Sequence, residues 1–156
     1  LLREFAVSPS QLQVELTESV AVSKCEVMSL RLRQLRDLGI ETALDDFGTG
    51  FSSINYLNKM PFDALKIDRS FVSGISSCSV DAEVIRAIIS LGRALGKTIV
   101  AEGVETDDDA RLLVEAGCHY LQGYFFSRPK QLVQILADYS SGSIRELTRC
   151  RPDTWA

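Results

Sequence analysis

The chain has 156 residues, of which 46% are hydrophobic and 24% charged, a composition typical of one globular domain with a core of its own. Its net charge of −4 argues against a protein that binds DNA or RNA polymers, so an anionic ligand would have to be attracted by local cations. No run of about 18 apolar residues is present, and we therefore expect no membrane span.

The cysteines and the single histidine exclude further classes of site. Cys25, Cys78, Cys118 and Cys150 form no C-x-x-C pair, so we expect no zinc site and predict reduced thiols in a cytoplasmic protein. His119 is the only histidine, which leaves no His-based dyad or metal cluster and favours a structural place beside a strand. The start of the chain also lacks the basic and apolar regions of a signal peptide.

Short apolar runs alternate with longer amphipathic segments along the chain. The runs are rich in Val, Ile, Leu and aromatic residues and predict buried strands at 12–16, 42–46, 64–68, 98–102 and 120–126. Helices are expected at 23–38, 79–95, 106–117 and 129–139, with a short one within 51–59. This order predicts an α/β fold of about five βα units with a parallel sheet and right-handed crossovers.

The same pattern gives the domain organisation. We assign residues 1–140 to one domain, and residues 141–156 to a C-terminal tail in which Ser143 to Glu146 could begin a short helix.

Polar or ionisable side chains lie at the carboxyl end of each predicted strand. They are Glu15 with Thr17 and Glu18, Asp45 with Asp46, Lys66 with Asp68, Glu102 with Glu105, and Gln122. Active sites of parallel α/β folds assemble at this edge of the sheet. The alternative is that strand ends simply turn polar where they meet solvent.

If the strands are neighbours, the side chains of Glu15, Asp45, Asp46 and Glu102 meet in one site at the carboxyl edge of the sheet. A single Lys66 cannot balance their charges. A hard divalent cation could, because carboxylate oxygens and water are its preferred ligands. A site of metal-bound carboxylates with one lysine suits phosphodiester hydrolysis or the stabilisation of an enolate. The sequence therefore predicts a metal site at the carboxyl edge.

The glycine-rich stretch that follows Asp46 resembles two well-known motifs and fits neither. Gly48, Thr49 and Gly50 belong to G-x-G-x-x-S, which departs from the dinucleotide fingerprint, and the adjacent carboxylates would repel a pyrophosphate. The D-F-G triplet lacks the other kinase motifs. We interpret the stretch as a loop that folds tightly over the metal site.

Five motifs in order resemble one family. They are ELTES (15–19), DDFGTGFSS (45–53), ALKIDRSFV (64–72), AEGVET (101–106) and LQGYFFSRP (121–129). Together they resemble the EAL-domain phosphodiesterases, which hydrolyse the bacterial messenger cyclic di-GMP to linear pGpG with Mg²⁺ or Mn²⁺ on a modified TIM barrel. The resemblance covers residues from about 10 to 130.

The resemblance implies a role for each matching residue. Glu15 and Asp45 would be metal ligands, Asp46 would lie at or beside a second ion, Lys66 would contact the attacking water or the phosphate, and Glu102 would be the general base or a further ligand. Glu18 would brace the 46–53 loop, which in the family couples dimerisation to metal binding. Glu105 and Gln122 would line the site, and the loop residues Gly48, Thr49 and Gly50, with Asp68, would bind substrate or support the ligands.

The resemblance also implies an incomplete TIM-type barrel. The family's Glu-Ala-Leu segment and an upstream Asn, both metal ligands, have no counterpart in the sequence, and a closed barrel needs about 250 residues. We therefore expect the C-terminal portion of the domain, a chain that by itself binds metal weakly and turns over slowly or not at all. The alternatives are a non-catalytic EAL-type module that binds cyclic di-GMP or a partner protein, and a metal-dependent lyase of the enolase kind. A homodimer is a further expectation from the family.

Overall fold

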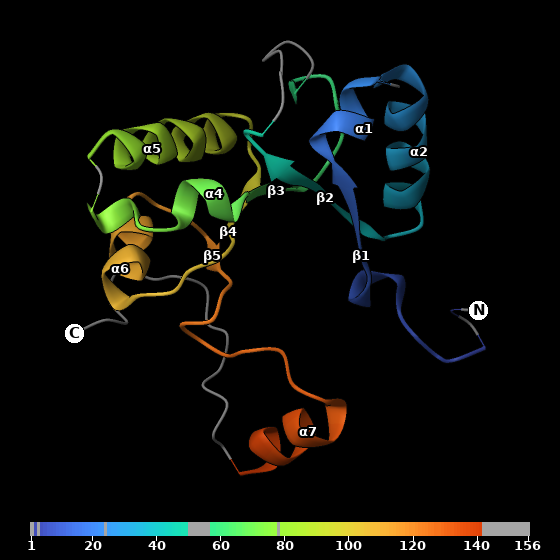
Figure 1. The fold of residues 1–156 in the computed structure, drawn as a ribbon. Coiled ribbons are helices and arrows are strands. Elements are labelled where there is room, and N and C mark those ends of the chain that lie inside the picture. The colour runs from blue at the N-terminus through green and yellow to red at the C-terminus, as the bar shows by residue number, and fades with distance from the viewer. Residues whose placement is uncertain (1, 3, 24, 50–56, 78, 142–156) are drawn as a thin grey trace.

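The computed structural model describes residues 2, 4–23, 25–49, 57–77 and 79–141, with residues 22, 23 and 25 described by their backbone alone. Its centre is a five-stranded parallel sheet in the order β1-β2-β3-β4-β5 (Figure 1). The strands are β1 Gln13–Thr17, β2 Glu41–Phe47, β3 Ala64–Ile67, β4 Thr98–Ala101 and β5 Tyr120–Leu121. The predicted α/β class, parallel sheet and chain order are confirmed.

In the described residues, helices follow β1, β3, β4 and β5. They are α1 Glu18–Ser23, α2 Cys25–Asp37, α4 Arg69–Val72, α5 Ser79–Ala94, α6 Asp107–Glu115 and α7 Leu132–Ser140, with 3-10 turns at Pro9–Gln11 and Ile75–Ser77. The helix predicted at 23–38 is α2, which begins at Cys25, whereas the short helix α1 directly after β1 was not predicted. Thr106 caps α6 as expected, since its hydroxyl accepts the backbone N–H of Asp109.

The sheet is open within the described residues. β1 pairs only with β2 and β5 only with β4, so the predicted incomplete barrel is what the structure shows. β5 ends at Leu121, although the aromatic run to Phe126 had predicted a longer strand. After Gln122 the backbone turns instead, with the N–H of Phe126 donating to the carbonyl of Gly123.

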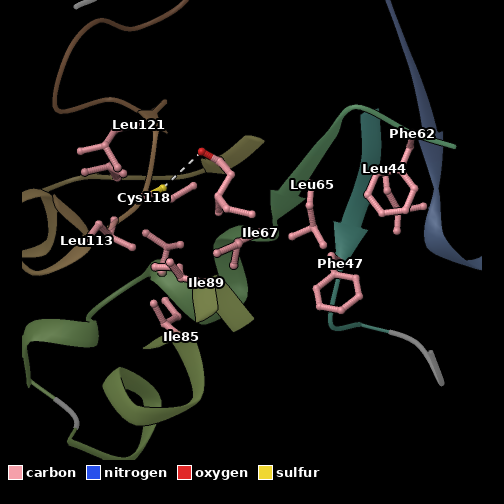
Figure 2. Close-up of a cluster of buried hydrophobic side chains, with 14 of the residues drawn as sticks. Leu44, Phe47, Phe62, Leu65, Ile67, Ile85, Ile89, Leu113, Cys118 and Leu121 are labelled. Atoms are coloured by element: carbon pink, nitrogen blue, oxygen red, sulfur yellow. Dashed lines mark hydrogen bonds between the residues drawn. The ribbon is translucent and has the colours of Figure 1, made fainter. Parts of the chain in front are cut away.

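The core fills the space between the sheet and the helices that follow its strands (Figure 2). Leu65 and Ile67 from β3 and Ile85 and Ile89 from α5 are each 0% exposed. Each such side chain contributes roughly 1.5–3 kcal/mol by leaving water. β3 lies at the centre of the sheet and is buried along its whole length, so it gives a well-packed support for a side chain near its carboxyl end.

Polar side chains at the amino-terminal edge of the sheet serve structure. The carboxylate of Asp63 accepts the backbone N–H of Thr42 at 2.8 Å and its hydroxyl at 3.0 Å. His119 Nδ1 accepts the backbone N–H of Ile99 at 3.0 Å, which gives the lone histidine the structural place predicted for it. The remaining concentration of ionisable groups is therefore at the opposite edge.

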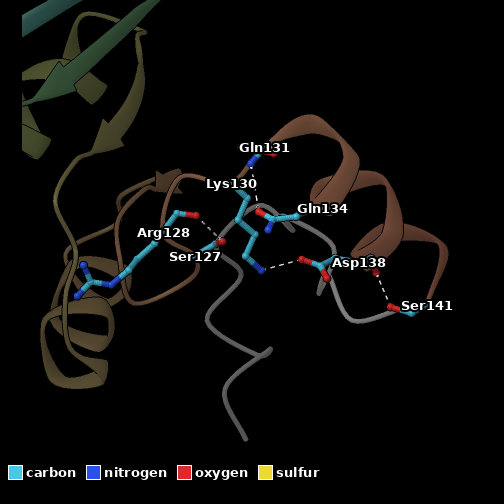
Figure 3. Close-up of polar contacts among 7 residues, drawn as sticks. All are labelled: Ser127, Arg128, Lys130, Gln131, Gln134, Asp138 and Ser141. Atoms are coloured by element: carbon cyan, nitrogen blue, oxygen red, sulfur yellow. Dashed lines mark hydrogen bonds and ion pairs between the residues drawn. The ribbon is translucent and has the colours of Figure 1, made fainter.

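Helix α7 extends away from the sheet (Figure 1) and buries none of its residues. It begins at Leu132. Pro129 therefore lies before the helix, and the prediction that Pro129 belongs to its first turn was wrong. Local contacts order this segment: Lys130 pairs with Asp138 at 2.7 Å, and the N–H of Gln131 donates to the side chain of Gln134 (Figure 3).

None of the helices in the described ranges is long and apolar enough to cross a membrane. The short helix predicted from Ser143, residues 51–56 of the one predicted within 51–59, and the site residue Gly50 lie outside the described residues.

Candidate active site

Lys66 is the centre of the charged cluster at the carboxyl edge of the sheet. Its Nζ lies 2.7 Å from Oε1 of Glu15, 3.3 Å from Oδ1 of Asp45 and 2.6 Å from Oε1 of Glu102. Its side chain is only 8% exposed, whereas those of the carboxylates are 20–43% exposed. Three carboxylates therefore reach one buried ammonium from the solvent side.

Strand order explains the convergence. Glu15 comes from β1, Asp45 from β2, Lys66 from β3 and Glu102 from the end of β4, and these strands are consecutive neighbours. Parallel strands bring their carboxyl ends to one edge, as the sequence had predicted. The convergence of these four residues is a geometric finding, whereas their chemical roles stay a prediction.

A β-bulge places the two adjacent aspartates. Leu44 pairs with Leu65 and Phe47 with Ile67, so Asp45 and Asp46 together lie opposite Lys66 alone. Asp46 takes the extra place with φ of 55°, a left-handed conformation that is uncommon outside glycine. Bulges redirect side chains and recur beside active sites. Here the bulge separates Asp45, which pairs with Lys66, from Asp46, which makes no ion pair with any described residue.

The electrostatics of the cluster follow from this geometry. Desolvation of the Lys66 ammonium acts to lower its pKa, but hydrogen bonds to Glu102 and Glu15 outweigh it and hold the pKa well above its usual range. Partial burial, followed by the negative charges of Asp45 and Asp68, raises the pKa of Asp46. Lys66 thus remains a cation, and the site still holds more negative than positive charge.

Glu18 fastens the loop that follows β2. The side chain is 1% exposed, and its Oε2 accepts the backbone N–H of Gly48 at 2.8 Å. Gly48 has φ of +99°, and a Cβ there would lie 2.6 Å from the ring of Phe71. Thr49 closes the turn by donating its hydroxyl to the carbonyl of Asp46 at 2.8 Å. The glycine at 48 is therefore required by both conformation and space.

Gly103, which follows Glu102 directly, was not among the predicted site residues. It has φ of +72°, and a Cβ there would overlap Cβ of Arg69 at the start of α4. A side chain at this position would push the end of β4 away from β3 and so move Glu102 relative to Lys66. The available signal was the glycine immediately after the carboxylate in AEGVET.

Three other predicted site residues do not contact Lys66. Asp68 caps α4, with Oδ1 accepting the N–H of Ser70 at 3.0 Å and its hydroxyl at 2.5 Å. The Ser70 hydroxyl is the main reason why the pKa of Asp68 is lowered. Glu105 and Gln122 are exposed, and among the described residues neither side chain forms a hydrogen bond or ion pair with the cluster.

The donor set suits a hard cation, but its arrangement holds an ammonium. Carboxylate oxygens are ligands that Mg²⁺, Mn²⁺ and Ca²⁺ prefer, and the buried Oδ1 of Asp45 forms no hydrogen bond with the described residues beside its 3.3 Å ion pair with Lys66. Yet no three His, Cys, Asp or Glu side chains in these parts of the chain are grouped to hold a metal ion. The carboxylates are arranged around Lys66 Nζ, so an ion could be held only after some of them rearrange.

The EAL domain family matches residues 1–129, which is most of the chain. The chain belongs to the EAL domain family. It is 44% identical over 137 residues to the bifunctional diguanylate cyclase/cyclic di-GMP phosphodiesterase MucR of Pseudomonas aeruginosa, covering 88% of this chain and 20% of that protein.

Two solved structures show how closely the fold agrees. A PaMucR phosphodiesterase in complex with c-di-GMP has a TM-score of 0.82 at 42% identity, with 86% of this chain and 54% of that chain covered. BlrP1 of Klebsiella pneumoniae with manganese and c-di-GMP has a TM-score of 0.75 at 32% identity, with 82% and 33% covered. The chain thus spans about a fifth of a full-length relative and up to about half of these solved chains.

Proposed function

We propose that this chain is a portion of an EAL domain that hydrolyses cyclic di-GMP to linear pGpG, in bacterial second-messenger signalling, with the help of Mg²⁺ or Mn²⁺. The observation that carries the proposal is the convergence of Glu15, Asp45 and Glu102 on Lys66 at one sheet edge. The relatives named as cyclic di-GMP phosphodiesterases and the c-di-GMP complexes among the similar structures support the choice of substrate.

Glu102 is the proposed general base. Its carboxylate is partly exposed, so it can reach a water molecule, and Lys66 holds it at 2.6 Å. In the proposed step Glu102 takes a proton from water, the water oxygen bonds to one phosphorus atom, and one P–O ester bond breaks. The proton then passes to the departing oxygen, which leaves as a hydroxyl group. Lys66 orients that water or offsets the negative charge that grows on the phosphate.

Glu15 and Asp45 are the proposed metal ligands, with Asp46 at or beside a second ion. A bound Mg²⁺ or Mn²⁺ would polarise phosphate oxygens and lower the pKa of a coordinated water. Glu18 supports these proposed ligands, because its hydrogen bond to the N–H of Gly48 fixes the loop that follows Asp46.

The outer residues complete the proposed site. Glu105, Gln122, Asp68 and the loop glycines and threonine would contact substrate or support the ligands. We keep residues 1–140 as the domain and 141–156 as a tail, whereas the family match ends at residue 129. A cytoplasmic location and a homodimer belong to the same proposal.

A second candidate is a non-catalytic module that binds cyclic di-GMP or a partner protein. It is favoured by one observation: Lys66 already pairs with the carboxylates, and no described group of three acids is arranged to hold a metal. Such a module would bind the nucleotide with the same affinity in the presence of a metal chelator, which calorimetry can measure.

The decisive experiment is to incubate the chain with cyclic di-GMP and Mn²⁺ and to separate the products by ion-exchange chromatography. We expect slow release of pGpG that requires Mn²⁺ and is abolished in the Glu102→Ala variant. Nucleotide binding without any metal-dependent product would reject the enzyme and support the module. Absence of both binding and product would reject both readings for this chain.

A further inference from the structure

Lys66 occupies the point at which the proposed metal ligands meet. The oxygens of Glu15, Asp45 and Glu102 all lie within 3.3 Å of its Nζ. Three like charges held this closely would repel one another strongly without a cation between them. The buried ammonium therefore performs in this structure part of the neutralisation that a metal ion would otherwise provide.

The same position leaves no room for a second cation. Oxygen ligands lie about 2.0–2.6 Å from Mg²⁺ or Ca²⁺, which is shorter than most hydrogen bonds from an ammonium. An ion at the centre of the three oxygens would overlap Nζ. An ion on the outer side of Glu15 and Asp45 would draw their oxygens away from Nζ and would itself be repelled by the ammonium.

The strands restrict how this conflict can be relieved. Lys66 comes from β3, whose flanking residues Leu65 and Ile67 are 0% exposed, so the backbone beneath the ammonium is fixed. Glu15 is the most exposed of the three carboxylates, at 43%, and lies on β1 at the open edge of the sheet. Glu15 is therefore the partner that can leave the ammonium most easily.

We propose that Lys66 is an internal counter-ion that competes with the divalent metal, so that metal binds only in exchange for the Lys66–Glu15 ion pair. The lysine then retains Glu102 and becomes free to orient water or phosphate. The inference rests on the metal use of the proposed function, and its test measures metal binding in the absence of nucleotide.

The first experiment compares Mn²⁺ affinity by electron paramagnetic resonance of the free ion. Lys66→Met removes the ammonium and keeps the length of the side chain, and we expect it to bind Mn²⁺ at least about tenfold more tightly than the unaltered chain, because the charge that repels the ion is gone. Lys66→Arg keeps the charge and should stay weak. The control is Lys130→Met, which removes an ammonium paired with Asp138 far along the chain and should change nothing.

A second experiment needs no variant. Labelling of lysines by acetic anhydride, read by mass spectrometry, should modify Lys66 faster at a saturating concentration of Mg²⁺ than in chelator, because the exchange removes Glu15 from the ammonium. Lys130 should be labelled equally in both conditions. This measurement decides the matter if Lys66→Met fails to fold without metal.

The outcomes separate this inference from the proposed function. Equal or weaker Mn²⁺ binding by a folded Lys66→Met variant, or labelling of Lys66 that does not respond to bound Mg²⁺, overturns the exchange and leaves the phosphodiesterase proposal standing. Absence of metal binding by both the unaltered chain and the variant rejects the exchange together with the metal-dependent function.

Discussion

Lys66 and Glu102 lie on adjacent parallel strands and meet at 2.6 Å at the carboxyl edge of the sheet. β3 and β4 are in register from Ala64 with Thr98 to Ile67 with Ala101, so Glu102 is the first residue beyond the paired segment. The backbone N–H of Glu102 still donates to the carbonyl of Ile67 at 3.1 Å. The backbone of Glu102 is therefore fixed, while its carboxylate is held by Lys66 and stays 21% exposed, so that water can reach it.

Glu102→Gln should reduce pGpG release by at least about 100-fold, because an amide cannot accept the proton that a general base takes from water. Release is measured with saturating cyclic di-GMP and Mn²⁺. Glu115→Gln, an exposed residue at the end of α6, is the matched control and should retain full activity. Equal activity of the two variants would exclude Glu102 as the base.

Glu18→Ala should lower the free energy of unfolding by about 1–3 kcal/mol, because it removes the hydrogen bond between the Gly48 N–H and a carboxylate that is only 1% exposed. Glu18→Gln keeps an oxygen in place and should cost less. Urea denaturation at neutral pH followed by circular dichroism measures both variants. If Ala and Gln cost the same, the bond to Gly48 is not what Glu18 contributes.

Much of the site could be predicted because the apolar runs indicate the order of the strands and where each strand ends. Glu15, Asp45, Lys66 and Glu102 each follow or end such a run, and parallel pairing brings them together. The bulge could not be predicted in this way. Two adjacent aspartates fit either register of β2, and only packing of Leu44 and Phe47 against β3 leaves Asp46 as the extra residue.

The misjudged boundaries have local causes. Aromatic residues after Gln122 favour a strand, but Gly123 lies so close to the backbone of Val104 that the chain must turn there. The N–H of Phe125 then donates to the carbonyl of Val104 at 3.0 Å. Such a close approach depends on tertiary structure and leaves no mark on hydrophobic periodicity beyond the glycine itself.

Gly103→Ala should destabilise the fold more than Gly74→Ala. Both glycines have positive φ, +72° and +76°, so both substitutions carry the strain of a left-handed conformation, whereas only the Cβ at 103 would overlap Arg69. The overlap should add about 1–3 kcal/mol to the loss in free energy of unfolding. Urea denaturation of the two variants measures the difference directly, and equal losses would show that Arg69 yields without cost.

Asp68 should make the stability of the chain depend on acid pH. Hydrogen bonds from Ser70 lower its folded-state pKa below the ordinary value of 3.8, so deprotonated Asp68 stabilises the fold above that value. The contribution is lost as the pH falls through the lower folded-state pKa. Asp68→Asn, which keeps a capping oxygen without the charge, should therefore be less stable than the unaltered chain at pH 6, and the difference should shrink as the pH falls below about 4.

Urea denaturation at a series of pH values from about 6 to 3 measures this difference. Ser70→Ala removes the hydroxyl but keeps the backbone donor, so its loss should have the same pH dependence at smaller amplitude. A stability difference between the unaltered chain and Asp68→Asn that stays constant across the series would mean that the charge of Asp68 does not support α4. The cap would then act through its neutral hydrogen-bonding shape alone, and Asp68 would be available for the ligand-supporting role that the family resemblance implies.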